Sequence, residues 1–252
     1  MYKIKMNGAE VTGAEFGETV EIPEGAIKIN TYAFCRCEAL TGVVIPPSIK
    51  SIECGAFERC TNLTSVTLYN GVKTIGADAF YGCEKLTNIT IPNSVTRIGV
   101  NAFSWCHSIL RINIPDSVEY IGEGAFWSCS SLTGIVLPPS ITSIRGGTFR
   151  ECHSFTSVVI PDSVTSIGNS AFYNCSNLVM VMVGKGVTSI GEYAFYRCHA
   201  LKRINIPSGV TSIGDNAFSD CTSLKRIKVP KHFDAESVKQ WGLPDTCEII
   251  WY

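Results

Sequence analysis

A phenylalanine returns nine times along this chain at intervals of 23 residues, and a cysteine follows each one three positions later. The phenylalanines are Phe34, Phe57, Phe80, Phe103, Phe126, Phe149, Phe172, Phe195 and Phe218. A fixed short period is typical of a solenoid, in which each unit buries its apolar face only against its neighbours. The 252 residues therefore predict a single elongated domain.

Each repeat has its own internal pattern, which averages to A-F-x-x-C-x-x-L-x-x-I-x-I-P-x-S-V-x-x-I-G-x-x. The L-x-x-I-x-I stretch predicts a short strand in a parallel ladder, and proline ends it because proline has no N–H to donate. The glycine indicates a backbone conformation that other residues resist. The A-F-x-x-C segment predicts one short helical turn, which makes this an α/β-type repeat of mostly short parallel strands.

The two ends lose the pattern and predict caps. We expect an N-terminal β cap over residues 1–19, a solenoid of about nine repeats over residues 20–230, and a C-terminal cap over residues 231–252. Asn7-Gly8 is a hairpin signal, Asp234 can cap a short helix, and the residues after Cys247 read as a last strand. Because such caps cover open strand edges, we expect a monomer.

Composition limits the kinds of partner that the protein is expected to bind and the cellular compartment in which it is expected to lie. Apolar residues make up 45% of the chain and the formal net charge is −1, so we expect a continuous core and no nucleic-acid partner. No apolar run reaches the ~20 residues that span a bilayer. The start shows no apolar leader, which favours a cytoplasmic location for the chain as given. A secreted or cell-surface protein whose leader has been removed is the alternative.

Nine of the twelve cysteines share one column of the repeat, so neighbouring thiols project in the same sense. Disulfides need Cβ vectors that face each other, and we therefore expect free, buried thiols, which favour a reducing compartment. Cys35, Cys37 and Cys54 form a closer group, and a redox role for them is left open.

The chain offers little that points to catalysis. His107, His153 and His199 share a column but lie two repeats apart, which separates them by ~10 Å. There is no nucleophile motif, no phosphate-binding loop and no zinc motif. We expect no enzyme activity, no cofactor and no metal.

The repeat unit L-x-x-I-x-I-P-x-S-V-x-x-I-G-x-x-A-F-x-x-C resembles the BspA-like class of leucine-rich repeats, over roughly residues 20 to 230. The resemblance implies a leucine-rich-repeat solenoid. It also implies a role in recognising proteins or cell surfaces, often by secreted or surface-attached proteins.

Recognition in a solenoid is expected on the variable, outward positions of the strand face. At these positions a set of apolar residues is followed directly along the chain by a set of basic residues. This arrangement predicts a docking surface for another protein. The alternative is that β-branched residues favour a strand and that charge protects an edge. The predicted partner-binding residues are Val136, Val159, Val179, Met180, Met182, Lys202, Arg203, Lys225, Arg226 and Lys228.

A second candidate surface is a row of aromatic residues between the phenylalanine and cysteine columns. Such rings stack sugars or anchor a protein, which would make the protein an adhesin for carbohydrate or host matrix. Alternatively, the rings cover the core. The row consists of Tyr81, Trp105, Trp127, Tyr173 and Tyr196.

Overall fold

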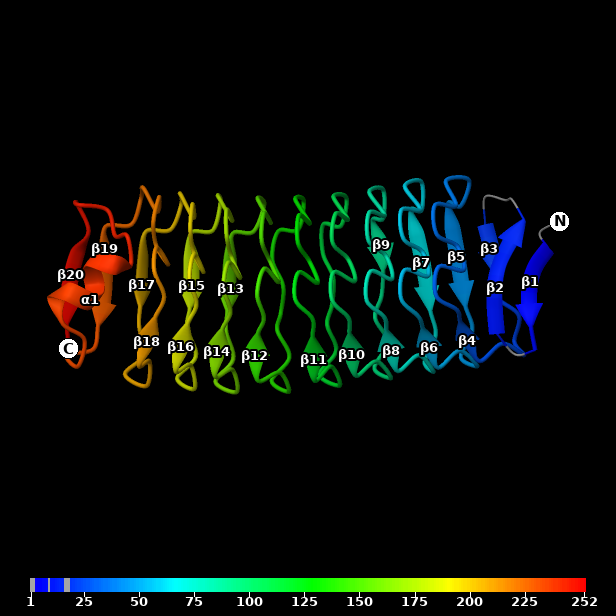
Figure 1. The fold of residues 1–252 in the computed structure, drawn as a ribbon, viewed down its shortest axis with the longest axis horizontal. Coiled ribbons are helices and arrows are strands. Elements are labelled where there is room, and N and C mark those ends of the chain that lie inside the picture. The colour runs from blue at the N-terminus through cyan, green and yellow to red at the C-terminus, as the bar shows by residue number, and fades with distance from the viewer. Residues whose placement is uncertain (1–2, 9, 16–18) are drawn as a thin grey trace.

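The protein is an elongated solenoid, seen here in a computed structural model that describes residues 3–8, 10–15 and 19–252. Figure 1 shows its turns stacked side by side in chain order, with the two termini at opposite ends. We call each turn a rung and number the rungs 1 to 9, from Phe34 in rung 1 to Phe218 in rung 9. Val43 pairs with Val66 and Val66 with Ile89, so the register confirms the period of 23 residues.

The L-x-x-I-x-I segments form the strand face, a row of parallel strands with alternating inward and outward side chains. The row is divided into a four-stranded sheet, β3-β5-β7-β9, and a five-stranded sheet, β13-β15-β17-β19-β20. Their bounds are β3 Thr19–Glu21, β5 Gly42–Ile45, β7 Ser65–Leu68, β9 Asn88–Ile89, β13 Ser157–Val159, β15 Met180–Met182, β17 Arg203–Asn205, β19 Arg226–Val229 and β20 Glu248–Trp251.

A second row follows the proline turns and consists of two-residue strands, extended at its N-terminal end by the longer β1 and β2. It is divided into β1-β2-β4-β6-β8-β10-β11 and β12-β14-β16-β18. The bounds are β1 Lys3–Asn7, β2 Glu10–Glu15, β4 Lys28–Ile29, β6 Ser51–Ile52, β8 Thr74–Ile75, β10 Arg97–Ile98, β11 Tyr120–Ile121, β12 Ser143–Ile144, β14 Ser166–Ile167, β16 Ser189–Ile190 and β18 Ser212–Ile213.

Both rows are interrupted between rungs 4 and 5, which the repeat pattern does not predict. In the second row, β11 of rung 4 and β12 of rung 5 belong to different sheets. On the strand face, neither rung carries an assigned strand, and only an isolated bridge joins Gly134 to Ser157 of rung 6. The turn side continues unbroken here, since the Phe103 amide donates to the Ala125 carbonyl at 2.8 Å.

The A-F-x-x-C segments are not helical turns, contrary to the expectation from sequence. Alternate amides bond three residues back within the rung, as from Cys106 to Phe103, whereas those between them bond to the next rung, as from Trp105 to Trp127. The residues two before and two after each phenylalanine have a positive φ in all nine rungs. This alternation directs every second N–H along the solenoid axis, which a helix cannot do. The described chain has one α-helix, α1.

The I-G glycines serve a different purpose from the one expected. None of them has a positive φ. Instead, the backbone of the preceding rung leaves no space for a side chain: a Cβ on Gly122 would lie 2.4 Å from the Val100 nitrogen. These glycines allow the rungs to approach closely.

The core is a continuous column of buried side chains that runs the length of the solenoid. The rings of Phe80, Phe103 and Phe126 lie in successive rungs, and their centroids are 5.4 and 5.6 Å apart. All three rings are fully buried. Each rung therefore depends on its neighbours for its core.

The elements at the two ends differ from those of the rungs. β1 and β2 form an antiparallel hairpin, and Glu10 on β2 bonds Lys28 on β4 at 2.9 Å. Residues 1–2, 9 and 16–18 of the predicted N-terminal cap lie outside the described residues. At the other end, α1 spans Ala235–Gln240, and its Trp241 carbonyl accepts the amide of Phe218. β20 then pairs in parallel with β19.

Candidate functional site

The predicted apolar residues lie together on the strand face of rungs 5 to 7. Val159 pairs with Met182 across β13 and β15, while Met180 and Met182 flank the buried Val181. The exposed fractions of Val136, Val159 and Met182 are 77%, 56% and 55%. Val179 is exposed beside Met180. The structure thus brings Val136, Val159, Met180 and Met182 onto one face, and we call these four residues together with the neighbouring exposed Val179 the apolar patch.

The predicted basic residues continue the same columns on β17 and β19. Met180 pairs with Arg203, and Arg203 pairs with Arg226. Arg226 also bonds the Glu248 carboxylate at 2.9 Å. Glu248 is not among the predicted residues, because only the parallel docking of β20 brings it beside Arg226.

Four basic side chains remain without an ion pair to any described residue: Lys202, Arg203, Lys225 and Lys228. All four are exposed. We call them the basic patch. Their charges are available to an acidic partner.

The two patches meet in a shallow depression of about 460 Å³ on the strand face. Met180 and Met182 line one side, and Arg203, Arg226 and Lys228 line the other. Asn205 contributes an amide between them, and it was not among the predicted residues. The arrangement can receive an apolar side chain that is flanked by carboxylates.

Most rings of the aromatic row contact a neighbouring ring or an arginine side chain. The Arg150 guanidinium lies 5.4 Å from the Trp127 ring centroid and 4.3 Å from that of Tyr173. Tyr173 stacks on Tyr196 at 4.8 Å, and Arg197 lies over Tyr196 at 5.2 Å. The faces of these rings are used by their neighbours, as expected of side chains that cover the core.

The row is more open at its N-terminal end. Trp105 has its edge-on neighbour, Trp127, on the rung 5 side, and 39% of its surface is exposed. Tyr81 in rung 3 is half-buried. Both residues line a second hollow, of about 480 Å³.

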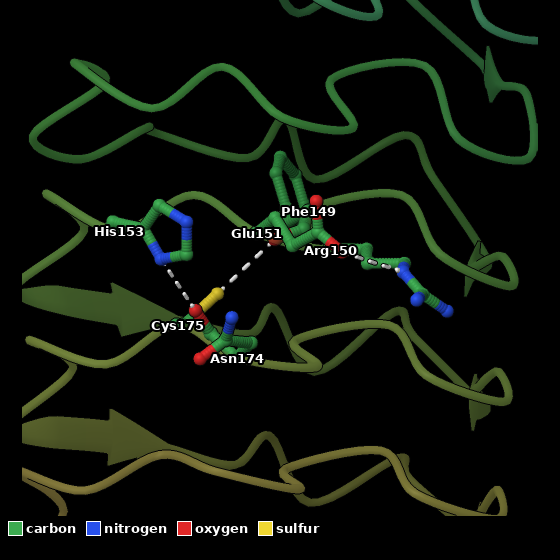
Figure 2. A network of polar contacts seen from close by, with 6 residues as sticks. All are labelled: Phe149, Arg150, Glu151, His153, Asn174 and Cys175. Atoms are coloured by element: carbon green, nitrogen blue, oxygen red, sulfur yellow. Dashed lines mark hydrogen bonds and ion pairs between the residues drawn. The ribbon is translucent and has the colours of Figure 1, made fainter.

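The cysteine column donates to the backbone of the neighbouring rung. In Figure 2, the Cys175 thiol donates to the Phe149 carbonyl at 3.1 Å, while His153 meets the Asn174 carbonyl at 3.0 Å. Eight thiols make this contact, from Cys60 to Cys221. The cysteines are free, as expected. The column ties adjacent rungs together.

Burial also controls the chemistry of these thiols. It raises the pKa of Cys129 to about 12 and the pKa of Cys106 well above its usual value. Because the thiolate is the reactive form, such thiols react slowly with oxidants in any compartment. The column therefore does not require a reducing compartment. Cys35 and Cys37 are half-buried free thiols, and burial raises their pKa too, while Cys54 is a half-buried free thiol.

The described residues hold no group of three or more His, Cys, Asp or Glu that is placed to bind a metal ion. His107 and His153 each bond a backbone carbonyl of the next rung. Within the same residues, no helix is long and apolar enough to cross a membrane.

These features define a class of protein: a parallel solenoid of 23-residue rungs with its variable residues on a strand face. A family model for the BspA type leucine rich repeat region matches residues 27–156 and 142–240, with six copies. The chain belongs to this family of leucine-rich-repeat proteins.

Solved structures share the fold. A leucine-rich repeat protein from Bacteroides ovatus is 24% identical, with a TM-score of 0.56, and the match covers 100% of this chain and 98% of that one. The leucine-rich repeat protein TpLRR of T. pallidum is 25% identical, with a TM-score of 0.59 and coverage of 98% and 95%. The pneumococcal vaccine antigen PcpA is 17% identical, with a TM-score of 0.53 and coverage of 99% and 91%. No curated protein matches the chain.

Proposed function

We propose that the protein is a non-catalytic scaffold that recognises another protein through the strand face of rungs 5 to 9. The depression where the apolar patch meets the basic patch carries this proposal. Contiguous exposed apolar surface on a soluble protein usually has a use, and methionine adapts to varied partners. Membership of a family of repeat-based binding proteins supports the same function.

The charge and the apolar character of this strand face indicate what kind of partner segment it binds. Arg203 and Lys228 line the depression beside Met180 and Met182 and form no ion pair with any described residue, so the complementary partner presents carboxylates beside an apolar side chain. The surface extends over five rungs, or ~20 Å at 4.8 Å per strand. An acidic, extended segment of a partner protein fits this shape and charge.

The test begins with capture of a partner from native lysate and continues with the purified partner. The dissociation constant is measured for the wild type and for the Met180→Glu, Met182→Glu double variant. We expect at least a tenfold weakening, because the two carboxylates repel the acidic partner and replace the apolar contact. Raising the salt concentration is also expected to weaken the wild-type complex.

The matched control is the Ser65→Glu, Thr67→Glu double variant. These residues occupy the same two columns in rung 2 and are exposed, so the same charge is added on the same kind of strand. The control is expected to bind as the wild type does. Equal binding by both double variants, or a captured partner with a basic binding segment, would refute the proposal.

A further inference from the structure

The second hollow lies where one column of the turn side lacks a side chain. The residue two positions after the phenylalanine is Arg36, Arg59, Trp105, Ser128, Glu151, Asn174, Arg197 or Asp220 in eight rungs, and Gly82 in rung 3. Gly82 is buried, with a φ of +68°, and a Cβ there would lie 3.3 Å from the Arg59 Cγ. The missing side chain leaves a gap between rungs 2 and 4.

Two different walls face each other across this gap. Arg59 is on the rung 2 side and Trp105 on the rung 4 side, separated by two rungs, or ~10 Å. Trp105 lines the hollow while its ring also contacts Trp127 at 6.4 Å and His107 at 5.5 Å. Tyr81 lines it beside Gly82. The volume of about 480 Å³ falls in the range of small-molecule sites, ~300–1,000 Å³.

The charged groups of the hollow balance one another. Arg36 and Arg59 contribute two positive charges, and Glu38 and Glu84 contribute two negative charges. Arg36, Glu38 and Glu84 form no ion pair with another described residue, and Arg59 has only a 3.9 Å contact with Glu58. The hollow therefore offers hydrogen-bond donors and acceptors together, without net charge.

We propose that this hollow binds a neutral sugar ring of a glycan. A pyranose presents C–H groups that pack on Trp105 or Tyr81, and its hydroxyls both donate to carboxylates and accept from guanidinium groups. A purely apolar ligand would bury those four charged groups without partners, which is unfavourable. An acidic or basic ligand would be repelled by one pair as it is attracted by the other. The site is separate from the strand face and does not depend on the protein-binding function.

The test uses an array of oligosaccharides that end in galactose, glucose, mannose or N-acetylglucosamine, together with sialylated and sulfated counterparts. Binding of a neutral glycan is expected, and its affinity is then measured by calorimetry. Gly82→Arg fills the hollow, and Trp105→Ser removes one wall. Both residue types already occupy this column at positive φ, as Arg59 and Ser128, so both variants are expected to fold. Each is expected to weaken binding at least tenfold.

Two controls locate the site. Asn174→Arg places the same side chain in the same column four rungs away, at a φ of 56°, and is expected to leave glycan binding unchanged. Met180→Glu with Met182→Glu alters only the strand face and is expected to do the same. The proposal fails if no neutral glycan binds, if only charged glycans bind, or if Gly82→Arg and Trp105→Ser bind as the wild type does.

Discussion

Replacing Gly122 by alanine tests whether the I-G glycines exist for close approach of the rungs. The added Cβ would lie 2.4 Å from the Val100 nitrogen and 2.5 Å from the Gly99 carbonyl carbon. Ordinary contact begins near 3.4 Å, so two rungs must separate by about 1 Å. Overpacking of this kind costs ~1–3 kcal/mol, and strain on the Gly122 to Ile98 hydrogen bond of 2.9 Å adds ~1 kcal/mol. We expect a loss of about 3 kcal/mol in the free energy of unfolding.

Alanine substitutions at two other glycines distinguish the effect of steric crowding from the effect of backbone conformation. Gly147 has a φ of +60° and its nearest neighbour would be 4.0 Å from a Cβ, so alanine there introduces only left-handed strain, about 1 kcal/mol. The φ of Gly134 is not positive, and the atom nearest to a Cβ added at this position would be 3.8 Å from it. Alanine at Gly134 is expected to be neutral or to stabilise slightly, because it restricts the unfolded chain.

Urea unfolding followed by circular dichroism measures the three free energies, and coincidence with tryptophan fluorescence checks that unfolding is two-state. The expected order of destabilisation is Gly122→Ala, then Gly147→Ala, then Gly134→Ala. If Gly147→Ala costs as much as Gly122→Ala, or more, the close-approach argument is wrong and backbone conformation controls these positions.

Three further changes address the core, the thiols and the C-terminal helix. Phe103→Ala opens a cavity between two stacked rings and is expected to cost ~3–5 kcal/mol by urea unfolding; a cost below ~1 kcal/mol would contradict the stacked core. Cys106→Ala removes a smaller group and its contact with the Phe80 carbonyl, so it is expected to cost less than Phe103→Ala, and reductant is expected to leave the wild-type Tm unchanged. A large drop of Tm in reductant would contradict the free thiols. Asp234→Ala removes the helix cap and is expected to lower Tm slightly at neutral pH. Hydrogen bonds from Ser237 lower the pKa of Asp234, so this stabilisation is present above the ordinary aspartate value of 3.8 and is lost as the pH falls through the lower pKa of the folded state. A Tm difference that persists at low pH would argue against this cap.

From the sequence, residues of the candidate surfaces could be predicted only where the repeat register shows that they point outward. Met180 and Met182 fall on outward positions of the strand pattern, and the structure places both on the exposed face. Glu248 lies outside the repeats, so its ion pair with Arg226 depends on how β20 docks. The hollow beside Trp105 was also missed, although the replacement of a side chain by Gly82 in its column was visible in the sequence.

The sequence by itself determined the solenoid, its period and its inward columns, because identical apolar positions every 23 residues can be buried together only by stacking. Tertiary structure decided how the turns are built. Asp78, Trp105 and Arg197 all adopt a positive φ, although residues of such different types share no local preference for it. Hydrogen bonds to the next rung impose that conformation. Such bonds join residues far apart in the chain, and therefore local sequence does not reveal them.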